Sequence, residues 1–321
     1  MKLKALAGTL CLIASLLSGA ALAQAYPTKT VRIIVPYQAG QGTDVMARYV
    51  AEQLTKSLGQ TFYVDNKPGA GGNIGTEAGA RSAPDGYTLT MGTNATHSMN
   101  AFLYPSVGYD AEADFAPIIL VGMLPMVISA NPDFSARSIT ELVAAATAKP
   151  DRIDVALPST SARIVFELLK ANTGAPLFGV PYKGSATAMT EVMGGQVQLI
   201  IDTATATRGH VAAGKLNALG ITTLKTSALL PGVKSVAEQG VGDFEMTAWN
   251  ALYAPHGTPQ PIIDMLNAEV AKILAQAETR QRLLLLGFEP AGGTATQLAA
   301  FERQERAKWG PLIKAAGLKG D

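Results

Sequence analysis

The stretch VRIIVPYQAGQGTDVMARYVAEQL, Val31 to Leu54, decides the fold, because an apolar strand leads through a glycine turn into an amphipathic helix. Gly40, Gly42, Thr43 and Asp44 lie at this turn. The first amide groups of a helix have no partners within the helix and carry the positive end of its dipole, so they favour a carboxylate or a phosphate. The stretch predicts an anion site, although a strand-to-helix turn capped by Thr43 or Asp44 would have the same sequence.

The chain begins with a segment typical of an exported protein. Two lysines precede the apolar run Ala5–Ala20, and small residues follow it. This order predicts a signal peptide over residues 1–23, with cleavage after Ala23 or after Ala25, and the apolar run is too short to span a membrane. We therefore expect a periplasmic protein. Cys11, the only cysteine, lies in the segment that would be removed, so the mature chain would contain no disulfide and no cysteine metal site.

The charge balance and the length narrow the class of protein. The full chain has 26 basic and 25 acidic residues; removing the leader removes two lysines and no acid, which leaves 24 against 25, a net charge of −1. A nearly neutral chain without a basic run does not neutralise a phosphate backbone, so no nucleic acid partner is predicted. Roughly 300 remaining residues exceed the usual size of one domain and favour two lobes with separate cores.

Apolar runs alternate with segments of helical periodicity along most of the chain. This alternation is typical of α/β domains in which helices cover both faces of a mostly parallel sheet. The predicted strands are 31–36, 61–65, 88–92, 118–122, 126–130, 153–157, 199–202, 218–221 and 251–254. The predicted helices are 43–57, 138–147, 162–173, 186–194, 261–275, 278–286 and 296–316.

Three passages near the start of the mature chain occur together: VPYQAGQGTD, NKPGAGGNIG and PDGYTL. In this order they resemble the substrate-binding proteins of tripartite tricarboxylate transporters, the TctC or Bug family. The likeness continues through VPYKGSATAMTEVMGGQVQLIID, AGKLNALGITT and AWNALYAPHGTP, and covers Tyr26 to about Leu318. The resemblance implies a two-lobed α/β periplasmic binding protein of the type II-like class, with a ligand cleft between lobes that each contain a mostly parallel sheet. We expect lobe 1 to comprise 26–125 and 253–321, and lobe 2 to comprise 126–252.

The resemblance also implies that two loops of lobe 1 hold a small organic carboxylate, largely through backbone amides and ordered water. The loops would lie side by side at the carboxyl ends of parallel strands, where open α/β sheets bind ligands. The matching residues of the first loop are Tyr37, Ala39, Gly40, Gly42, Thr43 and Asp44, and those of the second are Thr93, Asn94, Ala95, Thr96 and His97.

Specificity is expected to come from lobe 2, where one loop differs from the glycine- and serine-rich loop common in the family. Ser159, Thr160 and Ser161 supply three hydroxyl groups here, and Arg163 supplies a guanidinium that could bind a second carboxylate in a bidentate fashion. This favours a dicarboxylate. Alternatively, Arg163 points to solvent or pairs with Glu167 one helical turn later.

Four further residues complete the predicted site: Tyr182, Asp202, Thr203 and Asn250. Tyr182 is expected either to contact the ligand or to be a half-buried core residue. Asp202 is better placed to cap a turn or position a loop than to touch an anion directly. Asn250 would reach the ligand from the wall opposite the first loops, while the preceding Trp249 packs at the hinge.

No enzyme is predicted. The sequence has three histidines but no HExxH pair, no GxSxG turn and no GK[ST] after its glycine loop, so neither a metal site nor a nucleophile with its base is indicated. A periplasmic hydrolase is a remote alternative, and no cofactor is implied. The expected partners of this monomer are its carboxylate and the permease subunits of a tripartite tricarboxylate-type transporter; a sensor kinase is the alternative, because ligand-driven closure serves either role.

Overall fold

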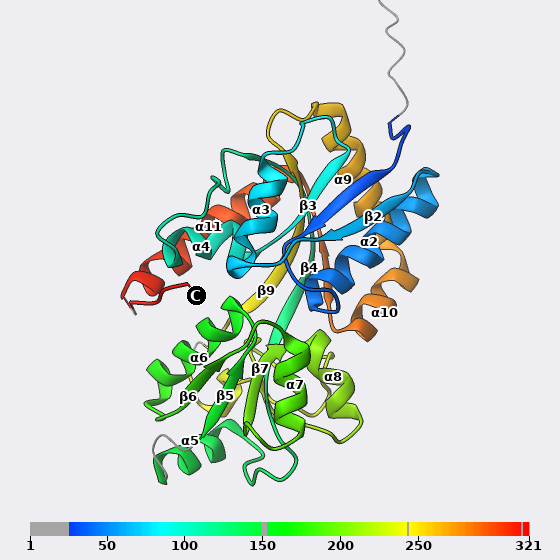
Figure 1. Ribbon diagram of the computed structural model, residues 1–321. Coiled ribbons are helices and arrows are strands. Elements are labelled where there is room, and N and C mark those ends of the chain that lie inside the picture. The colour runs from blue at the N-terminus through cyan, green and yellow to red at the C-terminus, as the bar shows by residue number, and fades with distance from the viewer. Residues whose placement is uncertain (1–25, 149–152, 243, 316, 321) are drawn as a thin grey trace, which may run out of the picture.

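The computed structural model describes residues 26–148, 153–242, 244–315 and 317–320. The predicted signal peptide lies outside the described residues. The described chain forms two α/β halves stacked on each other, and two long strands run along the line that joins them (Figure 1). The prediction of a two-lobed α/β fold is confirmed.

The first half contains a sheet in which parallel and antiparallel pairs are mixed. β1 is parallel to both of its neighbours, whereas β9 is antiparallel to β3 and β4. In sheet order the strands are β2 (Phe62–Asn66), β1 (Val31–Val35), β3 (Thr88–Thr93), β9 (Thr247–Pro255) and β4 (Phe115–Ala130), with β10 (Glu289–Gly292) paired to β4. The helices of this half are α2 (Gly42–Leu58), α3 (Asn73–Ala80), α4 (Asn100–Leu103), α9 (Gln260–Ala275), α10 (Ala277–Leu286) and α11 (Ala295–Ala315).

The second half continues from the far end of β4. β5 is parallel to β6 and β7, and β4 is antiparallel to β7 and β8. Its strands are β5 (Asp154–Leu157), β6 (Phe178–Pro181), β7 (Leu199–Thr203) and β8 (Asn217–Ile221), and its helices are α5 (Ile139–Ala148), α6 (Thr160–Thr173), α7 (Ser185–Met193) and α8 (Ala204–Ala212). The sheets are thus parallel at their outer strands and antiparallel around β4 and β9, where we expected mostly parallel pairing throughout.

One strand, β4, replaces the two strands predicted at 118–122 and 126–130. It spans 16 residues and includes Pro125. Pro125 is the last residue of β4 paired with β9, and Met126 is the first paired with β7. The proline therefore lies where the strand changes partners, which is a position that tolerates the loss of an N–H donor.

The chain passes between the halves a second time just before β9. Thr222 ties the two crossings together, because its hydroxyl accepts a hydrogen bond from the Met126 amide at 2.9 Å and donates one to the Met246 carbonyl at 2.5 Å. From Thr247 onward β9 pairs with strands of the first half. Residues 247–252, which we had assigned to lobe 2, thus belong to the sheet of the first half.

Helix α2 positions the glycine turn that contains Gly40 and Gly42. Its buried residues Met46, Val50 and Leu54 recur at helical spacing and pack into the main core, and Gly59 ends the helix in the left-handed conformation with φ of 70°. The strand before it, β1, is buried at four of its five positions. The turn between them is therefore held rigidly at the carboxyl end of β1. Within the described residues, no helix is both long and apolar enough to cross a membrane.

Candidate functional site

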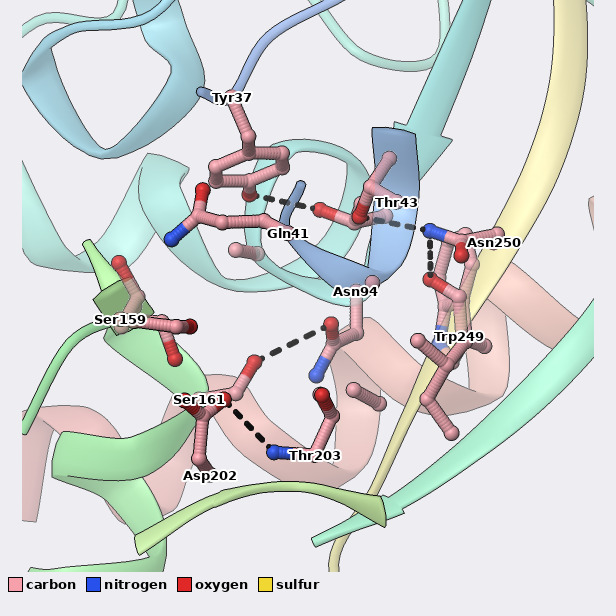
Figure 2. A pocket seen from close by; sticks show the side chains of 17 residues that line it. Tyr37, Gln41, Thr43, Asn94, Ser159, Ser161, Asp202, Thr203, Trp249 and Asn250 are labelled. Atoms are coloured by element: carbon pink, nitrogen blue, oxygen red, sulfur yellow. Dashed lines mark hydrogen bonds between the residues drawn. The ribbon is translucent and has the colours of Figure 1, made fainter. Parts of the chain in front are cut away.

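A cavity of about 50 Å³ lies between the two halves, and residues from both line it. Figure 2 shows the first half contributing Tyr37, Thr43 and Asn94, while Ser159 and Ser161 approach from the second half. The Ser161 hydroxyl donates to Asn94 Oδ1 at 3.4 Å, which links the two walls directly. The two walls therefore touch across the cavity.

The start of α2 forms the floor of the first wall. Gly42 and Thr43 occupy its first positions, where backbone N–H groups have no partner within the helix. Gln41 precedes the helix and its side chain makes no capping hydrogen bond. A Cβ atom on Gly42 would lie 2.8 Å from Leu124 Cδ2, so Leu124 would have to shift, and 3.4 Å from Thr203 Oγ1 of the opposite wall, which is ordinary contact. The helix end is thus an uncapped donor site facing the cavity.

Asp44 supports this wall from behind and does not line the cavity. One carboxylate oxygen accepts hydrogen bonds from the Gly40 amide and Arg48 Nε, both at 2.9 Å, and the other accepts from Asn66 Nδ2 at 2.9 Å. Burial acts to raise the pKa of Asp44, but the hydrogen bonds from Arg48, Gly40 and Asn66 outweigh it and hold the pKa below its usual value. Asp44, which we expected to bind the ligand, therefore fixes the shape of the turn as an ionised anchor behind the cavity lining.

The second loop of the first half follows β3 and begins with a turn of π-helix, Ala95–Met99. Thr93 Oγ1 lies 3.0 Å from the Tyr37 hydroxyl, and the Thr93 amide donates to Thr96 Oγ1 at 3.0 Å. Burial raises the pKa of Tyr37 to about 12, so its hydroxyl is neutral and can donate into the cavity. These contacts join the two predicted loops into one rigid wall.

His97 lies behind this wall. Its ring is fully buried, stacks on Tyr253 with centroids 4.0 Å apart, and places Nδ1 2.9 Å from Thr96 Oγ1. Burial lowers the pKa of His97 to about 3, and the positive charge of Arg306 acts in the same direction. His97, which we expected to contact the ligand, is therefore a neutral packing residue outside the cavity lining.

The second wall is built from the starts of α6 and α8 and from the end of β7. Ser159 caps α6, since its Oγ accepts from the Ala162 amide at 3.2 Å, and Thr203 caps α8 in the same way at 3.3 Å from the Ala206 amide. Asp202 is the last residue of β7 before Thr203 and is 3% exposed. Burial raises the pKa of Asp202 to about 6, although hydrogen bonding by Ser185 and Thr203 acts to lower it.

Asn250 lies on the first wall, whereas we expected it opposite. It pairs with Thr93 across the β9–β3 ladder, and its Nδ2 donates to Thr43 Oγ1 at 3.0 Å. Asn250 was placed on the wrong wall because we expected the chain to return to the first half only at residue 253, whereas β9 enters that sheet at Thr247. Trp249 is buried as predicted and donates from Nε1 to Glu305, but it also lines the cavity.

The structure brings most of the predicted site residues together. Those that line the cavity are Tyr37, Gly42, Thr43, Thr93, Asn94, Ala95, Ser159, Thr160, Ser161, Asp202, Thr203 and Asn250. Those outside its lining are Ala39, Gly40, Asp44, Thr96, His97, Arg163 and Tyr182. Arg163 lies within α6, because the helix begins at Thr160 and carries it one turn along, away from the lining.

Sequence reasoning missed five lining residues: Gln41, Leu124, Ser185, Ala248 and Trp249. Ser185 begins α7 directly after the strand β6, which the sequence did not predict, so the rule that ligands lie at the carboxyl ends of strands was not applied there. The same rule would have indicated Gln41 as a lining residue, because it lies between the end of β1 and the start of α2. None of the lining residues is an arginine or a lysine.

An outer groove of about 680 Å³ adjoins the cavity and shares Tyr37, Gln41, Ser159 and Thr160 with it. Four prolines and the ring of Tyr182 also line it, together with Lys183. The Tyr182 hydroxyl donates to Glu191, so this tyrosine belongs to the groove and not to the cavity. The groove provides space into which a ligand held in the cavity can extend, beside the ammonium group of Lys183.

No group of histidine, cysteine, aspartate or glutamate side chains in the described ranges could hold a metal ion. The site therefore consists of helix-start amides, hydroxyls, amide side chains and one buried carboxyl group. Such a set can hold and orient an anion through hydrogen bonds.

Comparison with known proteins agrees with this arrangement. The sequence model of the tripartite tricarboxylate transporter family receptor matches residues 46–318. Protein BugT of Bordetella pertussis is 36% identical over 300 residues, covering 92% of each chain. The solved structure of R. palustris Rpa4515 with adipate is similar with a TM-score of 0.89 and 33% identity, over 92% of this chain and 99% of that one.

A further solved structure, MatC from Rhodopseudomonas palustris with bound malate, has a TM-score of 0.82 and 30% identity, over 90% of this chain and all of that one. The family match spans most of the chain, and the relatives match over nearly their whole length. The chain therefore belongs to the receptor family of tripartite tricarboxylate transporters, the TctC or Bug family, whose members are solute-binding proteins and not enzymes.

Proposed function

We propose that this protein captures a small organic dicarboxylate between its two halves in the periplasm and delivers it to the permease subunits of a tripartite tricarboxylate-type transporter. The observation that carries the proposal is the cavity between the uncapped start of α2 and the second half. The family assignment and the adipate and malate of the two similar structures support it. The signal peptide predicted at the start of the chain supports the compartment.

One carboxylate of the ligand would lie at the start of α2. A carboxylate there can accept hydrogen bonds from the backbone amides of Gly42 and Thr43 and from the neutral hydroxyl of Tyr37. Charge-assisted hydrogen bonds of this kind are roughly twice as strong as neutral ones. The proximal carboxylate would therefore be bound without a basic side chain.

The second carboxylate would lie in the outer groove. Arg163 was the expected partner for this group, but Lys183 is the basic residue that lines the groove beside the cavity. Lys183 is exposed, and a diacid long enough to leave the cavity would bring its distal charge toward the ammonium group. Exposed pairs of this kind stabilise only weakly, so Lys183 would tune the choice of ligand and contribute little to the total affinity.

Capture would proceed by closure of the halves about the two crossings near Thr222. We propose lobes divided at 125/126, where β4 changes partners, and at 246/247, where β9 enters the first sheet. A ligand that contacts both walls favours the closed arrangement. The closed protein would then present one continuous surface to the permease. Uptake of the ligand that persists in cells lacking every permease of this type would instead favour the sensor kinase as the partner.

The variant Lys183→Gln tests the dicarboxylate proposal. We expect it to weaken adipate by about threefold and to leave hexanoate, a monoacid of the same length, unchanged, because only the diacid carries the distal charge. Isothermal titration calorimetry measures both affinities. Lys215→Gln, an exposed lysine outside the groove, is the control. Equal loss of both acids, or adipate binding that is indifferent to Lys183, would contradict the role of the groove.

A further inference from the structure

The second ligand loop of the first half is supported from behind by the last helix of the chain. Asn94 and Ala95 line the cavity, and Ser161 of the second half donates to Asn94 (Figure 2). Ala95 is also the first residue of the π-helical turn Ala95–Met99. A π-helical turn is uncommon and is seldom longer than one turn, so the side chains packed against it help to hold its shape. The placement of Asn94 and Ala95 at the cavity therefore depends on contacts outside the cavity.

Two side chains from distant parts of the chain reach the carbonyl groups of this turn. Arg306 on α11 donates from Nη1 to the His97 carbonyl at 3.0 Å, and the Tyr109 hydroxyl lies 2.7 Å from the Thr96 carbonyl. A hydrogen bond from an ionised donor is roughly twice as strong as one between neutral groups. The guanidinium of Arg306 is therefore the stronger of the two attachments.

The guanidinium is itself held in place. Its Nη2 donates to Glu112 at 2.9 Å, and its Nη1 lies 3.4 Å from Glu302 Oε2. The other oxygen of Glu302 accepts from the Tyr253 hydroxyl at 2.5 Å, and the Tyr253 ring stacks on that of His97. With its side chain only 18% exposed, Arg306 thus connects the turn to both β9 and α11.

We propose that Arg306 is a positioning residue for carboxylate binding, because its hydrogen bond to the His97 carbonyl holds the turn that places Asn94 and Ala95 at the cavity. The inference rests on the proposed function, since it requires that this cavity bind a carboxylate. Arg306 does not line the cavity, and two glutamates lie against its guanidinium and offset its charge. It therefore acts on the ligand through the turn.

The variant Arg306→Ala tests this role. Purified residues 26–321 are titrated by calorimetry with adipate and hexanoate, at a temperature where thermal unfolding shows every variant to be folded. We expect both acids to bind about 10-fold more weakly, near the lower end for a hydrogen bond to a charged group. The two losses should be equal, because the carboxylate that both acids share lies against the first wall.

Arg303→Ala is the matched control. Arg303 lies on the same helix and 4.0 Å from the same Glu112, but its side chain is 57% exposed and makes no hydrogen bond with the turn among the described residues. We expect this variant to bind both acids normally. Amide hydrogen exchange, read by mass spectrometry, gives a second measurement. Residues 93–100 should exchange faster in Arg306→Ala and not in Arg303→Ala, because only the first loses a contact of the turn.

Chemical rescue separates the lost hydrogen bond from general damage to α11. Guanidinium chloride at about 20 mM is far below the molar concentrations that unfold proteins, and its cation is the group that Arg306→Ala lacks. A cavity of about 170 Å³ behind the turn, lined by Arg306, His97 and Glu112, gives the cation access. We expect guanidinium to raise the affinity of Arg306→Ala by at least about threefold, whereas sodium chloride at the same concentration should not.

Weaker binding by Arg306→Ala that guanidinium restores, together with faster exchange of residues 93–100, would support the positioning role. Unchanged affinity, unchanged exchange, an equal loss in Arg303→Ala or a loss that guanidinium does not restore would overturn it. Each of these four results would leave carboxylate capture intact. Failure of the unmodified protein to bind adipate, hexanoate and malate would instead overturn the proposed function, and the positioning role with it.

Discussion

Gly42→Val is expected to weaken ligand binding by about 100-fold, the upper range for forcing extra carbon atoms, here an isopropyl group, into a packed site. A Cβ atom at this position already lies 2.8 Å from Leu124 Cδ2, before any further methyl group is added. Leu124 can shift, but it lines the same cavity, so its shift takes space from the ligand. The remaining neighbour, Thr203, belongs to the opposite wall, so relief on that side would hold the halves apart.

Calorimetry with whichever carboxylate binds the unmodified protein measures this loss, and thermal unfolding shows whether the variant is folded. Gly209→Val provides the control, since Gly209 lies on the exposed side of α8 with nothing within 4 Å of a Cβ atom. We expect this control to bind normally. Normal binding by Gly42→Val would mean that the start of α2 does not contact the ligand.

Asp44→Ala is expected to lower the free energy of unfolding by about 3 kcal/mol, the scale for losing a buried, charged acceptor of several hydrogen bonds. The substitution removes the acceptor of the Gly40 amide and of Arg48 Nε, and one of the two acceptors of Asn66 Nδ2, which keeps its hydrogen bond to the Tyr37 carbonyl. These groups shape the glycine turn, so ligand binding should weaken as well. Denaturant unfolding at pH 7 measures the change. Glu52→Ala is the matched control, because Glu52 pairs with Lys56 on the exposed face of the same helix and should contribute little.

The difference in unfolding free energy between the unmodified protein and Asp44→Ala should depend on pH. The pKa of Asp44 is lower in the folded protein than its usual value of 3.8, so the stabilisation is complete above that value and is lost as the pH falls through the folded pKa. The stability difference between unmodified protein and Asp44→Ala should be constant between about pH 5 and 8 and should shrink below about pH 4. A difference that grows on acidification would contradict an ionised, hydrogen-bonded Asp44.

The parts of the fold that the sequence predicted well have strong local signals. α2 combines helical spacing of buried residues with a glycine at each end, and β1 is a short continuous apolar run. β6 was missed because its four residues are exposed or half-buried and carry no apolar pattern. β4 was divided in two because a proline usually ends a strand, whereas Pro125 occupies a change of partners that depends on distant strands.

The errors in the site have similar causes. The sequence predicts a helix from residue 162 with Arg163 in its first turn, but the cap by Ser159 starts α6 two residues earlier, at Thr160, and Arg163 lies outside the cavity lining. Asn250 was assigned to the wrong wall because its position depends on pairing with Thr93, far away in the chain. His97 follows a ligand loop in sequence, but the π-helical turn buries its ring against Tyr253. Each depends on a tertiary contact that no local pattern specifies.

The most direct test of carboxylate capture is the distance between the halves with and without ligand. Residues 26–321 contain no cysteine, so Ala101→Cys and Asn172→Cys, both exposed and on opposite halves, can be labelled selectively for single-molecule fluorescence energy transfer. Saturating carboxylate should shift the population to a single short distance, and removing it should restore longer ones. A carboxylate that binds without changing the distance distribution would contradict capture between the two walls.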